Sequence, residues 1–183
     1  MIYLLDLFGS FAFAVSGGFR AVKHELDLLG LSVLALATGI GGGIIRDVLL
    51  GINPPGSLKD ERYLLVCLAG AFVVYVAAPR IAVRWNRVLV ADALGLSVFA
   101  AIGAAKAESH GAGMLTTVMM AMLTACGGGV IRDLLVIELP AILKIDFYAT
   151  AAMLGGFVYS ISGHLGWSEP VRLTVTILLT LIL

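Results

Sequence analysis

The sequence predicts an all-α integral membrane protein with seven transmembrane helices, arranged as two inverted three-helix repeats plus a seventh helix. Three observations predict this fold class. Hydrophobic residues make up 60% of the 183 residues, whereas a soluble domain has about 45–50%. Charged residues make up 13%, about half of the usual ~25%. A glycine-rich motif that ends in Arg-Asp also occurs twice, once in each half of the chain.

The composition also excludes several classes of function. A soluble enzyme of this length could not bury so much apolar surface. The 12 basic and 12 acidic residues cancel, so there is no basic excess to bind the phosphates of a nucleic acid. The two cysteines, Cys67 and Cys126, lie far apart in apolar runs, which argues against a disulfide framework or a zinc site. Enzyme and nucleotide-binding motifs are missing, and we expect no catalytic residue, cofactor or metal.

Seven apolar runs approach the roughly 20 residues that cross a bilayer core. They lie at residues 3–19, 28–50, 63–78, 88–105, 113–136, 147–163 and 170–183. The first run carries Asp6 in place of a basic start and lacks a small-residue cleavage site, so we interpret it as a retained span and not a signal peptide. The seventh run would cover only about 21 Å of the ~30 Å core, so it either begins earlier or continues beyond Leu183.

The connections between the runs are short and carry most of the charge, and they predict the orientation of the chain. If the amino terminus lies on side A, side B receives Arg20, Lys23, Arg80, Arg84, Arg87 and Lys144. Side A receives Lys59, Arg62, Lys106 and Arg172. Because cytoplasmic loops are richer in Lys and Arg, we expect a multi-pass protein of the inner membrane with its amino terminus outside and its carboxyl terminus in the cytoplasm.

An internal repeat organises this single transmembrane domain of residues 1–183. Residues 41–47 read Gly-Gly-Gly-Ile-Ile-Arg-Asp, and residues 127–133 read Gly-Gly-Gly-Val-Ile-Arg-Asp, an offset of 127 − 41 = 86. The same offset pairs Asp6 with Asp92, Arg20 with Lys106 and Pro54 with Pro140. Repeat one covers 3–78, repeat two covers 88–163, and the seventh helix at 170–183 stands outside. Because each repeat has an odd number of spans, the second enters the membrane from the opposite face.

The two glycine triplets are the first candidate site residues. Each glycine destabilises a helix interior by about 1 kcal/mol relative to alanine, so the triplets need a compensating role. Glycine allows the close approach of another backbone, and it also permits a kink or unwinding beside a water-filled cavity. We expect both helices to be broken there and to cross near the middle of the membrane as pore hinges. The six residues are Gly41, Gly42, Gly43, Gly127, Gly128 and Gly129.

The charged residues that follow the glycines are the second set of candidates. Arg46, Asp47, Arg132 and Asp133 lie inside apolar runs, where a charge costs about 2.5–3.5 kcal/mol and usually pairs or lines a polar path. Adjacent helical residues point about 100° apart, so we expect each arginine to pair with another helix, such as the aspartate of the other repeat. These groups would then converge beside a water-filled passage. In the alternative, they extend to the headgroups and the glycines serve packing alone.

The roles of the other polar and charged residues can each be interpreted in two ways. Asp6 and Asp92 could form a polar pore mouth, or they could be favourable carboxylates at helix amino termini. Arg20, Lys23 and Lys106 are expected to be anchors at the membrane interface, with gating as the alternative. The three histidines are expected to be surface residues, with pH sensing as the alternative. They are His24, His110 and His164.

With two copies of the glycine motif in a seven-span chain, the sequence resembles the prokaryotic members of the trimeric intracellular cation (TRIC) channel family, also described as a glycine transporter domain. The resemblance covers roughly residues 3–180. It implies a homotrimer with a separate pore in each protomer, permeable to monovalent cations and chiefly to potassium. It also implies bends at Gly41–Gly43 and Gly127–Gly129 and a peripheral seventh span. Membrane lipid is the other expected partner, although the Lys-Glu-Val lipid motif of animal members is absent here.

Two transport functions fit these residues, and a structural role without transport is the third alternative. In a potassium channel, the glycines would shape a constriction between the two repeats. Arg46 and Arg132 would set its electrostatics or close a gate, with Asp47 and Asp133 as their partners. In a secondary transporter of glycine or a similar zwitterion, an arginine would bind the substrate carboxylate and an aspartate its ammonium group. A non-conducting scaffold protein would need these residues for stability only.

Overall fold

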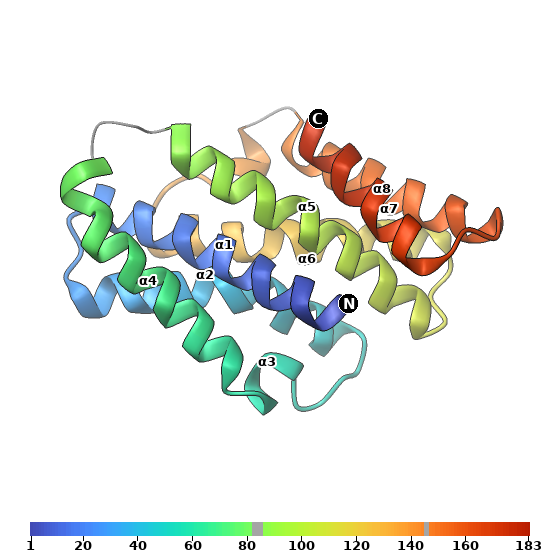
Figure 1. Cartoon of the computed structure of the whole chain (residues 1–183), viewed down its shortest axis with the longest axis horizontal. Coiled ribbons are helices and arrows are strands. Elements are labelled where there is room, and N and C mark those ends of the chain that lie inside the picture. The colour runs from blue at the N-terminus through green and yellow to red at the C-terminus, as the bar shows by residue number, and fades with distance from the viewer. Residues whose placement is uncertain (82–85, 145–146) are drawn as a thin grey trace.

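The computed structural model describes residues 1–81, 86–144 and 147–183, and all regular structure in them is helical (Figure 1). The prediction of an all-α fold is therefore confirmed. The long helices are α1 (Ile2–Lys23), α2 (Leu28–Leu49), α4 (Arg62–Ile81), α5 (Asn86–Ser109), α6 (Met114–Leu135), α7 (Tyr148–His164) and α8 (Glu169–Ile182). Two short elements lie in connections: α3 (Gly56–Lys59) and the 3₁₀ helix η1 (Ala141–Leu143).

The long helices fall on the predicted apolar runs, with boundaries shifted by a few residues. Within the described residues, four of them are long and apolar enough to cross a membrane: α1, α2, the segment Leu89–Ser109 of α5, and α6. The apolar segment Arg62–Ala77 of α4 is shorter. Helix α8 has 14 residues, as short as the sequence predicts. The basic residue Arg84, which contributes to the predicted orientation, lies outside the described residues.

The helix ends follow from local sequence. Helix α2 begins after Asp27, whose side chain accepts a hydrogen bond of 2.7 Å from the amide of Gly30, a common way to satisfy a free helical amide. Helices α2 and α6 both end just after their Arg-Asp pair. The backbone at Ile137, two residues beyond α6, takes a left-handed conformation with φ of 57°, which turns the chain back toward the bundle.

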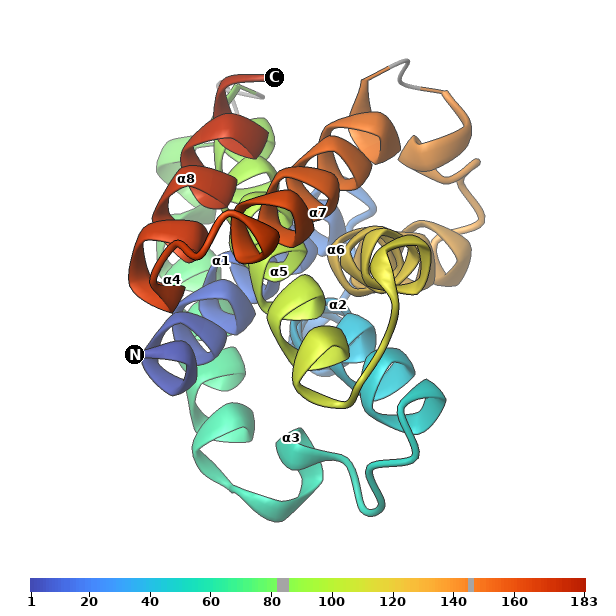
Figure 2. The same cartoon turned by 90° about the vertical axis from the view of Figure 1, so that its right-hand side faces the viewer.

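The helices pack as two similar groups that share a long interface. In one group, α1 contacts α2 and α4, and in the other, α5 contacts α6 and α7. The groups meet where α1 packs on α5 and α2 packs on α6, while α8 covers α5 and α7 (Figure 2). This packing places the carboxyl-terminal halves of α2 and α6, which carry the glycine motifs, in the interior.

Buried charged residues lie within a mainly apolar core that includes Phe13, Phe99 and Ile102, and many other large apolar residues lie on the outside. The buried side chains include Asp6, Arg46 and Arg132, together with many alanines and glycines. Large apolar side chains project outward from every long helix. Examples with their exposed fractions are Leu4 (69%), Leu29 (72%), Phe72 (65%) and Leu115 (75%). An apolar exterior around an interior that holds the charged side chains is the arrangement of a protein surrounded by lipid.

Candidate functional site

The middle glycine of each triplet lies where α2 and α6 cross in antiparallel directions. A Cβ atom added to Gly42 would lie closer than 3.0 Å to the carbonyl oxygen of Thr124, and one added to Gly128 would lie equally close to the carbonyl oxygen of Thr38. The two backbones therefore touch, and no side chain fits between them. Both helices continue unbroken through their triplets, so the expected unwinding is absent from this conformation.

The third glycine of each triplet faces an arginine instead. A Cβ atom on Gly43 would meet only the Nη2 atom of Arg46, at 3.6 Å, and one on Gly129 would lie 3.6 Å from the Nη2 atom of Arg132 and 3.0 Å from the hydroxyl of Tyr148. The triplet thus has two roles in the packing, because its middle residue permits the crossing while its third residue leaves room for a charged side chain.

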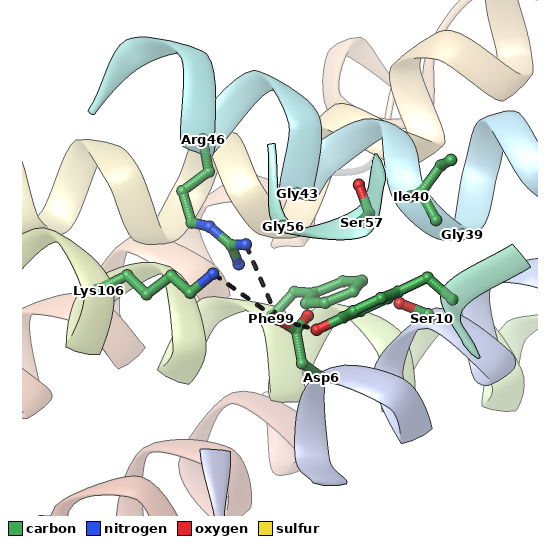
Figure 3. A pocket seen from close by; sticks show the side chains of 11 residues that line it. Asp6, Ser10, Gly39, Ile40, Gly43, Arg46, Gly56, Ser57, Phe99 and Lys106 are labelled. Atoms are coloured by element: carbon green, nitrogen blue, oxygen red, sulfur yellow. Dashed lines mark hydrogen bonds and ion pairs between the residues drawn. The ribbon is translucent and has the colours of Figure 1, made fainter. Parts of the chain in front are cut away.

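One cluster of ionic groups lies beyond the crossing, toward the end of α2. We call it the Arg46 cluster, and it consists of Asp6, Arg46, Asp47 and Lys106. Arg46 Nε donates to Asp47 Oδ1 at 2.8 Å, and its Nη2 lies 3.8 Å from Asp6 Oδ2. Lys106 Nζ lies 3.5 Å from Asp47 Oδ1 and 3.9 Å from Asp6 Oδ2. Figure 3 shows Arg46 from α2 and Lys106 from α5 pointing toward Asp6 of α1.

A small cavity borders the Arg46 cluster. Tyr63 donates to Asp6 at 3.1 Å, and the amide of Gly56 donates to Asp47 at 2.8 Å. A cavity of about 10 Å³ lies beside these groups, roughly the space for one water molecule. Among the described residues, Arg46 Nη1 and Ser57 Oγ are buried without a hydrogen-bond partner, and both residues line this cavity.

The second cluster lies on the opposite side of the crossing, toward the end of α6. We call it the Arg132 cluster, and it consists of Arg20, Asp92, Arg132 and Asp133. Arg132 donates from Nη1 to Asp92 and from Nε to Asp133 Oδ1, the latter at 2.9 Å. Arg20 Nη2 lies 3.3 Å from Asp133 Oδ1. Each cluster thus holds two cations and two carboxylates, so their formal charges cancel.

Neighbouring groups make the Arg132 cluster the tighter of the two. Ser16 Oγ accepts from Arg132 at 2.7 Å and donates to Asp92 at 2.8 Å. The hydroxyl of Tyr148 donates to Asp92 at 2.8 Å, and the amide of Ala141 donates to Asp133 at 2.9 Å. These four hydrogen bonds measure 2.7–2.9 Å, whereas Lys106 of the Arg46 cluster lies 3.5 and 3.9 Å from its two aspartates.

The prediction that each arginine pairs with another helix is confirmed, but it missed a second partner and the aspartates are not those of the motif in the other repeat. Each arginine binds the adjacent aspartate, whose other carboxylate oxygen accepts a hydrogen bond from the first amide of a short helical element, that of Gly56 in α3 or Ala141 in η1. Each arginine also approaches a second aspartate on another helix, Asp6 or Asp92. The ion pairs between the two halves are made by other residues, since Lys106 reaches Asp47 and Arg20 reaches Asp133.

The expected convergence of the charges at the crossing was wrong. Arg46 lies four residues beyond Gly42, and Arg132 lies four residues beyond Gly128, which is about 6 Å along each helix axis. Because α2 and α6 are antiparallel, these steps lead in opposite directions. Both arginines are 2% exposed and Asp47 is 1% exposed, so the water-filled passage that the sequence predicts is closed in this conformation.

Two further predictions need correction, and some residues of the site escaped prediction. Arg20 and Lys106 are members of the clusters and pair with buried carboxylates, a role that their interpretation as interfacial anchors did not include. Asp6 and Asp92 are buried and bound by tyrosine and arginine, so they do not cap helix amino termini. Tyr63 and Tyr148 both donate to an aspartate of a cluster. They are 85 residues apart and not 86, so the repeat offset does not pair them.

Glu138 is another residue that the sequence did not reveal. It lies in the connection between α6 and η1, outside the long helices, and accepts hydrogen bonds from Arg20, Lys23 and His24. Partial burial opposes its ionisation, but the hydrogen bonds from Lys23 and His24 and the charge of Arg20 outweigh burial. They lower the pKa of Glu138 from 4.5 to about 2.

The low pKa of Glu138 predicts a pH-dependent contribution to stability. A carboxyl group whose pKa is lower in the folded state stabilises the fold above its unfolded pKa, and this contribution is lost as the pH falls from about 4.5 to 2. We expect the unfolding midpoint of the protein in detergent to exceed that of Glu138→Gln at neutral pH, and the difference to vanish near pH 2. A constant difference across this range would contradict the assignment.

Known proteins resemble this chain along its whole length. The family model described as glycine transporter matches it twice, at residues 3–79 and 89–164. A UPF0126 membrane protein of Vibrio cholerae is 38% identical over 185 residues, covering 100% of this chain and 77% of that protein. The UPF0126 inner membrane protein YadS of Escherichia coli K12 is 39% identical over 188 residues, covering 99% of this chain and 90% of YadS.

Solved structures give the same result. The TRIC trimeric intracellular cation channel orthologue from Rhodobacter sphaeroides superposes with a TM-score of 0.95 and 36% identity, covering 99% of this chain and 93% of that one. A second TRIC cation channel, studied for its conductance, superposes with a TM-score of 0.89 and 42% identity, covering 98% and 88%. The helical arrangement described above is therefore shared with membrane proteins of known structure.

Proposed function

The chain belongs to the family that unites the UPF0126 membrane proteins with the bacterial TRIC channels, and from this we propose that it is a channel for monovalent cations, chiefly potassium. We further propose that it is a homotrimer with one pore in each protomer, and that it is not an enzyme. The TRIC relatives of solved structure are cation channels. The observation that carries the proposal is the pair of neutral ionic clusters on either side of the glycine crossing.

These clusters suit a cation pathway for an electrostatic reason. Buried charges inside a membrane bundle are expensive and mark ion or substrate paths. An arginine alone would repel a permeating cation, but each cluster contains as many carboxylates as basic groups. The path would run from one cluster past the crossing of α2 and α6 to the other cluster, with Asp6 and Asp92 at its two mouths.

The two halves of this path are proposed to be inverted repeats. The same family model matches residues 3–79 and 89–164, which supports repeats at 3–78 and 88–163 with a seventh span at 170–183. The contacts support the same relation, since Gly42 approaches Thr124 as Gly128 approaches Thr38, two pairs related by the offset of 86. Inverted repeats are common in transport proteins and place the site at their interface.

Opening of the path is proposed to begin with the basic side chains that cross between the halves. Lys106 makes the longest contacts of the Arg46 cluster, at 3.5 and 3.9 Å, and its side chain is 26% exposed. Its departure would leave Asp6 and Asp47 with only Arg46, a net negative charge that a potassium ion could balance. The glycine triplets would act as hinges at the crossing while Arg46 and Arg132 gate the two ends.

A secondary transporter of glycine is the second candidate, supported by the description of the family model. Arg46 and Asp6 would then bind the carboxylate and ammonium groups of the substrate. The cavity beside them measures about 10 Å³, which suits one water molecule or an ion of similar size. Glycine has five non-hydrogen atoms and would require a larger cavity, so the structure favours the cation.

We propose that the protein lies in the inner membrane, with its amino terminus outside and its carboxyl terminus in the cytoplasm. The excess of basic residues on the side where α1 ends supports this orientation. Labelling of single cysteines placed at Met1 and Leu183 in intact cells would test it. Reaction at both ends, or at the carboxyl terminus alone, would contradict the orientation.

The functional test is a recording from purified protein in planar lipid bilayers. We expect unitary potassium currents of picoampere size, with no saturable uptake of labelled glycine into proteoliposomes. Saturable glycine uptake without unitary currents would establish the transporter instead. The absence of both activities would favour a scaffold role.

A charge substitution tests whether the ion passes through the Arg46 cluster. Asp47→Asn leaves Arg46 and Lys106 facing only Asp6, so the Arg46 cluster becomes positive. A potential of about one kT at the path would reduce the local cation concentration, and thus the unitary conductance, roughly threefold. The matched control is Asp27→Asn, at the other end of the same helix, because asparagine preserves the helix cap. An equal conductance in Asp47→Asn and wild type would exclude this route for the ion.

A further inference from the structure

A larger cavity lies beside the Arg132 cluster, where the end of α8 meets the amino-terminal halves of α5 and α7. We call it the α8 cavity, and its volume is about 210 Å³. Asp92 lines it together with Phe147, Tyr148 and Leu181. Phe147 is 66% exposed, so the cavity opens on the apolar exterior of the bundle and connects a buried carboxylate with that exterior.

Asp92 has an acceptor position left for a ligand in the α8 cavity. A carboxylate accepts about four hydrogen bonds. Oδ1 of Asp92 accepts from Arg132 and Ser16, and Oδ2 accepts from Tyr148 at 2.8 Å. Within residues 1–81, 86–144 and 147–183, these three are the donors to Asp92. We therefore expect a donor in the cavity to bind Oδ2, which carries a single bond.

The charge around Asp92 favours a neutral ligand over a cation. Arg132 already forms an ion pair with Asp92, and the formal charges of the Arg132 cluster cancel. A cationic ligand would have to leave water for an apolar cavity and would make the cluster positive, which is costly. A neutral hydroxyl group donates the same kind of hydrogen bond without this electrostatic cost.

The size of the α8 cavity sets the size of the ligand. An apolar cavity of about 150 Å³ in a protein core binds benzene. At about 210 Å³, the α8 cavity has room for an aromatic ring with a short arm that carries a hydroxyl group. Phe147 and Leu181 provide apolar contacts for the ring, while Asp92 accepts the hydrogen bond.

Two departures from the internal repeat make room for the α8 cavity. The offset of 86 pairs Ala93 and Ala151, which line the cavity, with Leu7 and Leu65 in the first half. The wall that contains Leu181 comes from α8, the helix outside the repeat. The second half of the chain thus has smaller side chains and an additional wall at this place.

Helix α8 is held at its other end independently of the cavity. Arg172, near the start of α8, donates to Glu108 of α5 and, at 2.9 Å, to the backbone oxygen of Tyr159 of α7. Its guanidinium also lies 4.0 Å from the centre of the Tyr159 ring. The wall that α8 contributes is therefore in place before a ligand binds, and a preformed cavity requires little reorganisation on binding.

We propose that the α8 cavity binds a small neutral alcohol or phenol dissolved in the bilayer, with its ring against Phe147 and Leu181 and its hydroxyl donating to Asp92 Oδ2. This binding site does not depend on the proposed channel function, and its test requires no current. It assigns a role to α8, which contributes no residue to either ionic cluster.

The test is quenching of tryptophan fluorescence by 4-bromobenzyl alcohol, since bromine quenches a nearby indole. A protein with Trp85→Phe, Trp167→Phe and Phe147→Trp has a single indole, at the rim of the cavity. In lipid vesicles, we expect its quenching to saturate as the alcohol is added. A control with Trp85→Phe alone keeps Trp167, which precedes the opposite end of α8, roughly 20 Å away by helix rise. Its quenching should rise without saturation, and the same curve for both indoles would overturn the proposal.

Two further quenchers test the hydrogen bond and the charge. At equal concentration in the membrane, 4-bromotoluene has the same ring without the hydroxyl and should bind at least about tenfold more weakly, the loss expected for a hydrogen bond to a charged group. Equal binding of the two compounds would refute the contact with Asp92. Tighter binding of 4-bromobenzylamine than of the alcohol would show that the site selects a cation and would overturn the proposed ligand class.

One variant closes the cavity while Asp92, Tyr148 and Arg132 stay unchanged. Ala93→Leu places in α5 the side chain that the first half carries at Leu7, and this larger side chain fills part of the cavity. It should abolish the saturable quenching while the folded peak in gel filtration is retained. Undiminished saturation in this variant would place the ligand elsewhere and overturn the proposal. If Ala93→Leu fails to fold, the comparison with 4-bromotoluene still decides, because it leaves Ala93 in place.

Discussion

Replacing Gly42 with alanine is expected to destabilise the bundle strongly, whereas the same change at the neighbouring Gly43 leaves it intact. At Gly42 the new Cβ atom would press against the backbone carbonyl of Thr124, closer than 3.0 Å. A backbone atom in a packed crossing cannot rotate away, so α2 and α6 must separate along their length. Overpacking of this kind costs about 1–3 kcal/mol and sometimes more. At Gly43 the only neighbour is the flexible end of Arg46, at 3.6 Å.

The comparison is sharp because both variants add one methyl group to the same helix. Alanine favours a helix over glycine by about 1 kcal/mol, so Gly43→Ala should be neutral or slightly stabilising. The midpoint of thermal unfolding in detergent, followed by loss of the folded peak in gel filtration, measures the difference. Gly128→Ala should behave as Gly42→Ala does, because its Cβ atom would meet the carbonyl of Thr38 equally closely.

The same pair of variants separates packing from hinge motion. Equal stability of Gly42→Ala and wild type would show that the helices part easily and that the crossing is not tightly packed. A stable Gly43→Ala protein with reduced open probability would show that this glycine serves as a hinge. Unchanged conduction in Gly43→Ala would limit the role of the triplet to close approach.

Sequence patterns predicted the parts of this structure that depend on periodicity. The helices follow from apolar runs of spanning length, and the offset of 86 correctly grouped Asp6 with Asp92 and Arg20 with Lys106. The pairing of Arg46 with Asp47 escaped prediction because it depends on a side-chain conformation and on the amide of Gly56, which α3 positions. Neither the side-chain conformation nor the position of this amide can be recognised in a hydropathy pattern.

Residues outside the repeat were the hardest to predict. Glu138 has no acidic counterpart, since Ile52 takes its place in the first half. Tyr63 and Tyr148 bind equivalent aspartates but are one residue out of register with the offset of 86. Deviations from internal symmetry are thus where this chain gains features that a repeat alone cannot supply, such as two unlike ends.

Because the two ends of the bundle differ, we expect replacement of the two arginines to reduce the free energy of unfolding by different amounts. Arg132→Met would leave Asp92 and Asp133 buried with Arg20 as the remaining cation, and the breaking of a buried ion pair costs about 3–5 kcal/mol. Arg46→Met should be less destabilising, because the contact of Arg46 with Asp6 is longer, at 3.8 Å, and Lys106 remains beside both aspartates. The cavity of about 10 Å³ also lets a water molecule compensate the carboxylates there. Urea unfolding of the two variants in detergent measures this difference.

A double substitution shows whether the loss in Arg132→Met arises from an unpaired charge. Asp92→Asn should restore part of the stability of Arg132→Met, because it removes one uncompensated carboxylate while it preserves the shape of the side chain. In the presence of Arg132, the same substitution should destabilise, so the two effects should be non-additive, as expected for groups in direct contact. Additive effects, or equal losses in Arg132→Met and Arg46→Met, would mean that the arginines stabilise the bundle through their volume alone. The clusters would then lose the electrostatic role on which a cation path through them depends.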